Sequence, residues 1–250
     1  MSAAIGEKKP TLEFVQFDPE KAGGIIRIPS EIDADSIVEL GQFIADYCVR
    51  EMAKWQDTVF FAADGTATYK SMKGCGKAAV DLGKKIGLGA TKTAPSDITL
   101  ADLRAMRGKV CSAALKNAAY FFHPTFETLL VKFNTPSNVT TLAHSKGQPV
   151  RLADPVYVAR GASGGPELDG YPVRFIPVLP AYTEEPSPAQ IQAVFGDASF
   201  QYLATRQDFT LQISRDVYFA TDEIAVRALE RFAVGLMDDS ALSALQLAPS

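Results

Sequence analysis

The chain has 250 residues, 47% of them hydrophobic and 22% charged, and a formal net charge of −4 at pH 7. This is the balance of a globular protein, long enough for one large domain or two modest ones. The charge is spread along the sequence without a basic stripe, which disfavours both nucleic-acid binding by counterion release and attraction to a membrane surface.

The three cysteines, Cys48, Cys75 and Cys111, show no C-x-x-C spacing. A disulfide framework or a thiolate zinc site is therefore not expected, and a reducing cytosol is the simplest compartment. No apolar run approaches the roughly 18 to 20 residues that span a bilayer, and the first residues lack the apolar stretch of a signal peptide. We expect a chain that stays in solution.

Two short strands are predicted near the N-terminus. Apolar residues alternate over 11–17, and three isoleucines lie in 25–28 after a Gly23-Gly24 break. We expect these two strands to form a hairpin.

A long helix is predicted within 33–62. Pro29-Ser30 and the acidic residues that follow can accept hydrogen bonds from the free N–H groups of a first turn. Apolar residues then recur at intervals of three, four and seven, which places them on one stripe. Asp64-Gly65-Thr66 should end the helix, because glycine adopts the left-handed conformation that helix C-termini often require. The stripe consists of Ile37, Leu40, Ile44, Tyr47, Cys48, Trp55 and Val59.

The middle of the chain mixes loops with short elements. Five glycines between 74 and 92 indicate a loop-rich region or an insertion around a possible short helix at 77–86. Ser96 or Thr99 is predicted to cap a short helix that ends at Gly108. Its apolar positions are Leu100, Leu103 and Met106.

An apolar strand is predicted at 118–122, followed by a helix from His123-Pro124 through Val131, because proline at the first helical position loses no hydrogen bond. The nine prolines between 134 and 190 disfavour helices there and indicate interrupted strands. Further strands are predicted at 191–195, 200–204, 209–213 and 224–234. With no internal repeat and no low-complexity linker, this mixed order predicts an α+β fold.

The string most like an enzyme motif is Gly161-Ala162-Ser163-Gly164-Gly165, a literal match to G-x-S-x-G. The nucleophile elbow needs a strand before the serine and a helix after it, whereas Pro166 follows here. Only His123 and His144 could act as bases. A surface loop is the better interpretation, and a serine hydrolase is the alternative.

Other motifs also lack the partners that their chemistry needs. Gly74-Cys75-Gly76 and the glycines of 87–92 do not complete a phosphate-binding loop, and the two histidines do not make a zinc site. Asp238-Asp239 indicates a solvated turn without a calcium pattern, and Tyr47 and Trp55 indicate core rather than base stacking. We assign no catalytic, cofactor-binding or metal-ligating residue and expect no cofactor.

The last third of the chain resembles phage major capsid proteins with the HK97 fold. The resemblance rests on the order of Gly170-Tyr171-Pro172-Val173, Phe195-Gly196-Asp197, the strand-like ATDEIAVRALERF at 220–232 and the terminal SALSALQL at 240–247. The helix at 33–62 is similar to the spine helix of that family. AYFFHPTFETLL at 119–130 is similar to the strand and helix that open its axial domain.

The resemblance implies a division of the chain into three parts. A partial E-loop and the strand that enters the peripheral domain would occupy 1–32. The peripheral domain with its spine helix would comprise 33–117 plus 205–236, and the axial domain 118–204 plus 237–250. We expect the helix to pack on the strands at 209–234. We also expect the hairpin at 11–28 to reach an adjacent subunit.

The implied function is that of a structural major capsid protein and not of an enzyme. Copies would form hexamers and pentamers of an icosahedral shell that encloses phage DNA, in the virion after assembly in the bacterial cytoplasm. Scaffold or delta segment, maturation protease and portal are the further partners implied, with no sequence-specific nucleic acid and no membrane.

Relatives generally carry an N-terminal arm before the E-loop, whereas this sequence starts within the region that resembles the E-loop. We therefore expect the chain alone to form capsomer-like or irregular oligomers. Two alternatives remain open: a truncated prophage capsid remnant that interferes with assembly, and an encapsulin-like cargo shell.

Overall fold

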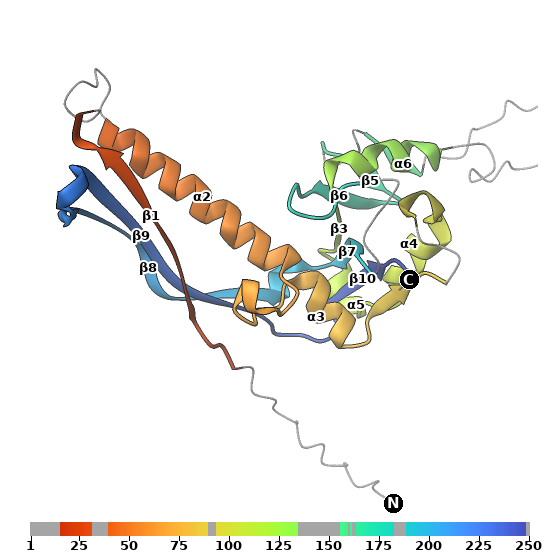
Figure 1. Cartoon of the computed structure of the whole chain (residues 1–250). Helices are drawn as coiled ribbons and strands as arrows, with labels where there is room; N and C mark the ends of the chain where they lie inside the picture. Colours follow the sequence, from red (N-terminus) through yellow and green to blue (C-terminus); the bar gives the residue numbers. More distant parts are fainter. Residues whose placement is uncertain are drawn as a thin grey trace, which may run out of the picture.

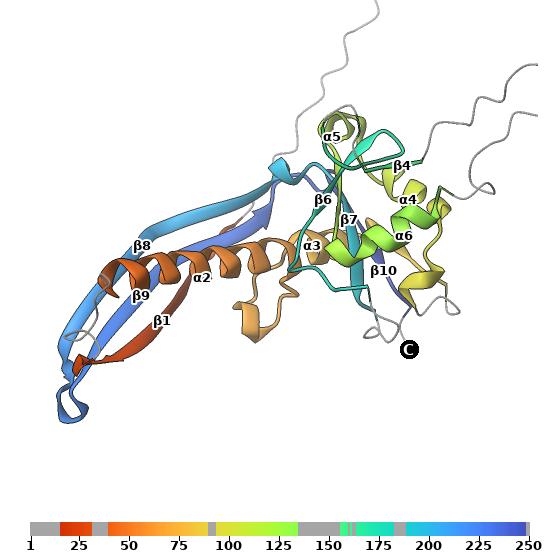
Figure 2. The same ribbon diagram turned by 90° about the horizontal axis from the view of Figure 1, so that it is seen from above.

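The computed structural model describes residues 16–31, 40–89, 94–134, 156–159, 161, 164–182 and 189–248. These residues form an elongated body and a compact body that lie end to end (Figure 1). The elongated body is a three-stranded antiparallel sheet in the order β1-β9-β8, with helix α2 along one face (Figure 2). Its elements are β1 (Glu20–Pro29), α2 (Leu40–Ala62), β8 (Gln201–Tyr218) and β9 (Glu223–Leu236).

Helix α2 forms where the apolar stripe predicts it. Ile44, Cys48 and Val59 are buried, and they pack with residues of β9 such as Val226 and Phe232. Because helical positions three, four and seven apart share a face, one stripe suffices to cover the sheet. The predicted contact between this helix and the strands at 209–234 is confirmed, while residues 32–39 lie outside the described part of the chain.

The end of α2 also follows the prediction. The helix stops at Ala62, Gly65 adopts a φ of +82°, and the backbone N–H of Thr66 donates a hydrogen bond of 2.9 Å to Oδ1 of Asp64. A side chain at Gly65 would be strained in this left-handed conformation.

The predicted hairpin of 11–17 with 25–28 is wrong for its described part. Residues 16–19 are not in a strand, and residues 11–15 lie outside the described residues. Strand β1 instead pairs along its whole length with β9, with Gly24 opposite Ala228. Gly23 and Gly24 therefore do not break the strand, because pairing with the long apolar strand β9 outweighs the local turn preference of two glycines.

The compact body is built on a mixed seven-stranded sheet in the order β2-β10-β7-β3-β6-β5-β4. Aromatic rings fill its core: Tyr120 lies 4.4 Å from Phe195 between ring centroids and 5.9 Å from Phe122. The strands are β2 (Lys85–Gly87), β3 (Ala119–Phe122), β4 (Tyr157–Val158), β5 (Glu167–Leu168), β6 (Tyr171–Phe175), β7 (Ile191–Gly196) and β10 (Leu242–Gln246).

Four short α-helices and five 3-10 turns complete the described chain. The helices are α3 (Cys75–Asp81), α4 (Leu100–Arg107), α5 (Ser112–Leu115) and α6 (Glu127–Lys132). The turns are η1 (Ala67–Tyr69), η2 (Pro95–Asp97), η3 (Pro124–Phe126), η4 (Ala198–Phe200) and η5 (Phe219–Thr221).

Several predictions about these elements are confirmed. Thr99 caps α4, since its Oγ1 accepts a hydrogen bond of 3.3 Å from the N–H of Asp102, whose carboxylate accepts one of 2.9 Å from the N–H of Thr99. Strand β3 and the helical segment η3–α6 follow in the predicted order, and β7 and β9 lie where apolar runs indicated them.

Two predictions about element boundaries are wrong. The short helix predicted at 77–86 is α3, which lies earlier and ends at Asp81, and the last residues of that range form β2, which pairs with β10. The strands predicted at 200–204 and 209–213 are one continuous strand, β8, with register shifts between Thr205 and Thr210. The bulged stretch carries polar side chains that hide its continuity in the sequence.

Two segments near the predicted domain boundaries are placed by their strand pairing. Strand β2 joins the seven-stranded sheet and α4 packs on β10, so these two elements lie in the compact body. Gln201 to Ala204 begin β8 and belong to the three-stranded sheet. Local sequence patterns do not predict this assignment, because it depends on which distant strands pair with each other.

Candidate assembly surfaces

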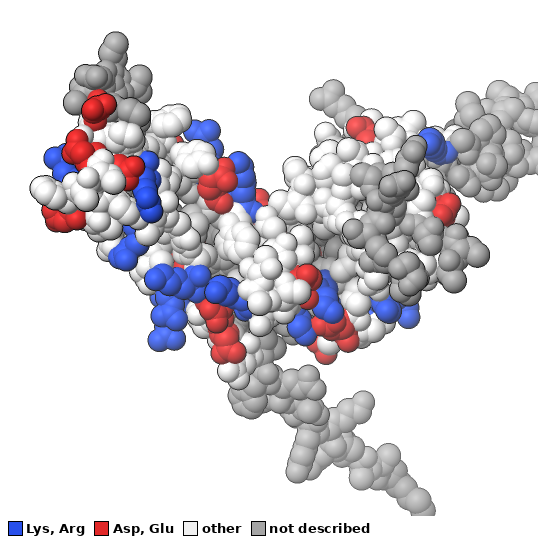
Figure 3. All heavy atoms as spheres, in the orientation of Figure 1, with Lys and Arg blue, Asp and Glu red and all other residues white. Residues whose placement is uncertain are grey.

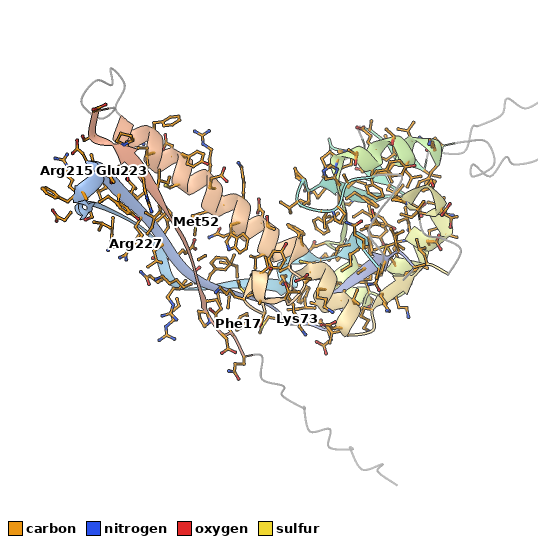
Figure 4. The ribbon with its side chains drawn as sticks, viewed as in Figure 1. Phe17, Met52, Lys73, Arg215, Glu223 and Arg227 are labelled. Atoms are coloured by element: carbon orange, nitrogen blue, oxygen red, sulfur yellow. The ribbon has the colours of Figure 1, made fainter. Side chains whose placement is uncertain are left out.

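One face of the three-stranded sheet is left uncovered by the described chain. Side chains alternate across a strand, so the burial of Val226 and Ala228 under α2 places Arg227 on the opposite face. Arg227 lies on this side in Figure 4 and donates a hydrogen bond to Oε1 of Gln212. The Arg27 guanidinium lies 4.1 Å from the ring centroid of Tyr218. This outer sheet face offers guanidinium groups to solvent.

Strand β1 forms an edge of the same sheet. Its partner is β9, and no other described strand pairs with it. An edge strand of ten residues leaves backbone N–H and C=O groups that can pair with another chain. Both signs of charge are interspersed on the face of the elongated body seen in Figure 3.

A cavity of about 520 Å³ lies between α2, β1 and the loop around η1. Its walls are mainly apolar and aromatic, with Trp55 stacked at 5.8 Å on Tyr69 beside it. We call it the α2–β1 pocket. It is lined by Lys21, Ala22, Gly23, Gly24, Ile25, Ile26, Tyr47, Cys48, Glu51, Met52, Trp55, Thr68, Lys70, Met72 and Ala228.

The β8–β9 turn ends the elongated body with an exposed aromatic side chain. Phe219 is 85% exposed, and Val217 beside it is 63% exposed. The turn is fixed to the end of β1, because the N–H of Ser30 donates a hydrogen bond of 3.0 Å to the carbonyl of Asp222. We call residues 215–223 the hairpin tip.

In the compact body, a carboxylate lies between two arginines. Asp169, in the turn after β5, accepts hydrogen bonds from Nε of Arg104 at 2.9 Å and from Nη2 of Arg107 at 2.5 Å. The hydrogen bond from Arg104 and the positive charge of both arginines lower the pKa of Asp169, against the opposing effect of its burial. The Arg107 guanidinium also lies 5.5 Å from the ring centroid of Tyr171. This contact fixes the β5–β6 turn to α4.

A buried carboxyl group lies where α2 meets the sheet. Glu230 on β9 is 5% exposed, and Oε1 accepts a hydrogen bond of 2.7 Å from Nε2 of Gln56. Burial raises the pKa of Glu230, the Gln56 hydrogen bond lowers it, and the charge of Asp208 on β8 raises it further.

The motifs considered for chemistry are not brought together by the described structure. His123 caps η3, with Nδ1 accepting a hydrogen bond of 3.2 Å from the N–H of Thr125, as expected for a turn residue. Oδ1 of Asp238 accepts a hydrogen bond of 2.8 Å from the N–H of Ser240. Ser163 and His144 lie outside the described residues. Gly74 precedes α3 and Gly87 ends β2, on separate elements.

Within the described ranges, no group of three or more His, Cys, Asp or Glu side chains could hold a metal ion. The described helices also include none that is both long and apolar enough to cross a membrane. Cys48, Cys75 and Cys111 are free thiols. Burial raises the pKa of Cys75 and Cys48, whereas a hydrogen bond with Ser240 lowers that of Cys111.

The α2–β1 pocket and the hairpin tip were missed by the sequence analysis. Trp55 packs against the buried cluster around Val59, as predicted, whereas Tyr47 is half-exposed, and both line the pocket. The strand-like pattern at 220–232 includes residues 220 and 221, which instead lie in the turn η5. The sequence signal for the turn is the polar run Thr221-Asp222-Glu223, which interrupts apolar residues on both sides.

The arrangement is that of phage capsid proteins. The capsid of the empty GTA particle computed with C5 symmetry is similar over 99% of this chain and 81% of that chain, with a TM-score of 0.67 and 15% identity. The capsid of the native GTA particle covers 99% and 79%, with a TM-score of 0.69 and 17% identity. A chain from Mycobacterium phage Bobi covers 94% and 73%, with a TM-score of 0.60 and 18% identity. These matches establish the fold and confirm the HK97-like prediction.

Residues 1–247 match the profile of the Phage capsid family, and the chain belongs to that family. No curated protein matches it. Its role is therefore that of a structural major capsid protein, and copies of it self-assemble into the capsid of a virion.

Proposed function

We propose that this chain forms hexameric and pentameric capsomers, which build an icosahedral shell around phage DNA. The proposal is supported mainly by the uncovered surfaces of the elongated body. This body leaves a sheet face, the β1 edge and an aromatic hairpin tip without a described partner in the same chain. Such surfaces are liabilities in a monomer and are used when copies meet.

The two bodies suggest how the subunit is divided in this shell. The elongated body corresponds to the peripheral domain, with α2 as its spine helix, and residues 1–32 contribute a partial E-loop. The compact body corresponds to the axial domain, extended relative to the prediction by β2, α4 and α5. Axial domains would meet around fivefold and sixfold axes.

Assembly through several modest interfaces needs no single strong contact, because closed symmetry adds their effects and weak contacts permit correction of errors. We propose assembly in the bacterial cytoplasm with a scaffold or delta segment, a maturation protease and a portal as further partners. The protein itself would have no enzymatic activity, no cofactor, no sequence-specific contact with nucleic acid and no contact with a membrane.

The proposal is tested by the mass and shape of the purified chain, by light scattering after size exclusion and negative-stain images of the same peak. Rings of five or six copies, irregular larger oligomers or closed shells are expected as concentration rises. Far-UV circular dichroism on the same sample shows that the chain is folded. A folded chain that stays monomeric at every concentration contradicts the proposal.

A further inference from the structure

The hairpin tip presents a large apolar side chain, Phe219, to solvent. Phe219 is 85% exposed, an unusually high fraction for an aromatic side chain. It lies in the short turn η5, which ends with Asp222 at a φ of 52°. The carbonyl of Tyr218 accepts a hydrogen bond of 3.2 Å from Oγ1 of Thr221, which fixes the turn from within. The aromatic ring is therefore presented on a held scaffold, so little conformational entropy is lost when it binds.

The α2–β1 pocket offers a complementary apolar cavity on the same molecule. Its volume of about 520 Å³ exceeds that of a phenylalanine ring, and Met52 points from α2 toward β1 across it (Figure 4). A Cβ added at Gly24 would meet nothing within 4 Å, so the cavity is open at β1. Methionine and aromatic walls suit an inserted aromatic side chain.

The hairpin tip and the rim of the α2–β1 pocket also carry opposite charge. The tip carries Asp216, Asp222 and Glu223 against a single Arg215. The pocket rim carries Lys21 and Lys70 against a single Glu51. Neither lysine forms an ion pair with a described residue. The tip is net negative and the rim net positive.

We infer that Phe219 of one copy inserts into the α2–β1 pocket of a second copy, as one of the contacts between subunits. The tip and the pocket of one chain cannot meet, because the tip lies at the far end of the sheet and Met52 lies in the middle of α2 (Figures 1 and 4). A knob on one surface and a cavity on another form a heterologous contact, which repeats around a ring or shell. This inference rests on the proposed self-assembly and specifies one of its interfaces.

The decisive experiment places p-benzoylphenylalanine at position 219 in the full chain. After assembly and irradiation, crosslinked pairs of chains are digested and mapped by mass spectrometry. Crosslinks to peptides that contain Met52, Trp55 or Met72 are expected, because benzophenone reacts readily with methionine and these side chains line the pocket. The same label at Tyr202, an exposed aromatic residue elsewhere on β8, should give no such crosslinks.

Crosslinks from position 219 to another tip, to residues 1–15 or to the compact body would overturn the inference. Assembled particles that yield no crosslink at all would overturn it as well. A wild-type chain that stays monomeric would contradict the proposed function itself, which keeps the two failures distinct.

Two variants test the contact from its two sides. Phe219→Ser should raise the concentration at which half of the chains assemble by about tenfold or more, because the apolar burial is lost. Gly24→Val should do the same by filling the pocket. Thermal unfolding of the monomeric fraction should be unchanged for Phe219→Ser, since the ring is exposed. Normal assembly of both variants would refute the contact.

Discussion

At the residue scale, the Glu230 carboxyl group is buried between α2 and the sheet. Gln56 of α2 donates to it, Asp208 of β8 faces it with like charge, and Ala22 of β1 lies opposite it. No described cation neutralises the carboxylate. Burial is the main cause of its raised pKa, so the charged form of Glu230 is disfavoured in the folded protein.

We therefore predict a pH-dependent effect of Glu230→Gln. The folded pKa of Glu230 is raised above its unfolded value, so its contribution is complete below the unfolded pKa and is lost as pH rises through the folded pKa. Above that range the glutamine variant should unfold at a temperature about 2 to 4 °C higher, the shift expected for roughly 1 kcal/mol in a chain of this size. The difference should shrink toward acid pH.

The measurement is thermal unfolding by circular dichroism from acid to neutral pH, with Asp57→Asn on the exposed side of α2 as the matched control. A glutamine variant that is less stable at neutral pH would show that the carboxylate has a favourable partner.

The pKa shift of Asp169 has the opposite sign to that of Glu230. The folded pKa of Asp169 is lowered, first by the hydrogen bond from Arg104, so its contribution is present above the unfolded pKa and is lost as pH falls through the folded pKa. Asp169→Asn should destabilise the protein by about 1 kcal/mol at neutral pH, a modest value because the Arg104 side chain is 47% exposed. Asparagine tolerates the φ of 52° at this position, so the change isolates the charge.

Urea unfolding at neutral and acid pH measures this effect, and Arg104→Lys tests whether the paired guanidinium geometry matters. Equal losses at both pH values would show that the effect is not electrostatic.

At the scale of elements, two neighbouring glycines in β1 have different roles. A Cβ at Gly23 would lie 2.5 Å from the carbonyl oxygen of Ala228, whereas a Cβ at Gly24 would meet nothing within 4 Å. Only Gly23 allows β1 to approach β9 at this register.

Gly23→Ala should therefore separate β1 from β9 and cost about 1 to 3 kcal/mol, while Gly24→Ala should change stability by less than about 0.5 kcal/mol. Denaturant unfolding gives the free energies, and hydrogen exchange of 20–29 shows whether the loss is local. If the two variants behave alike, the close approach is not what holds β1.

The elements differ in how far local sequence decided them. Helix α2 and the Thr99 cap of α4 were predictable because their signals lie within one or two turns. The pairing of β1 with β9 joins residues about 200 positions apart, so no local pattern could reveal it. The same limit concealed the α2–β1 pocket, whose walls come from four separate segments.

At the scale of the whole molecule, each body has its own buried cluster. Phe232 packs with Val59 and Met72 in the elongated body, and Tyr120, Phe195 and Leu245 pack in the compact body. The bodies are joined through α3 and the long strands (Figure 2). Stability should therefore differ between them.

Phe232→Ala should create a cavity in the elongated body and cost about 3 to 5 kcal/mol. Hydrogen exchange measured by mass spectrometry should show lost protection in α2, β1 and β9 and retained protection in β3 and β7. Leu245→Ala is the matched variant in the compact body, with the reverse pattern expected. A uniform loss of protection in both variants would show one cooperative unit.

The resemblance to the capsid family, the α+β class, the spine-like helix and the order of most elements could be predicted from the sequence alone. Hydrophobic periodicity and helix capping involve only a few consecutive residues, and the motifs of the last third of the chain can be recognised directly in the sequence. Three features depend on tertiary packing and could not be predicted: which strands share a sheet, where the two bodies divide and which apolar side chains remain exposed. Phe232 and Phe219 are both phenylalanines near the same strand, yet one is buried and the other is 85% exposed. Burial depends on what the rest of the chain brings to each side chain, and that is settled only when distant segments pack.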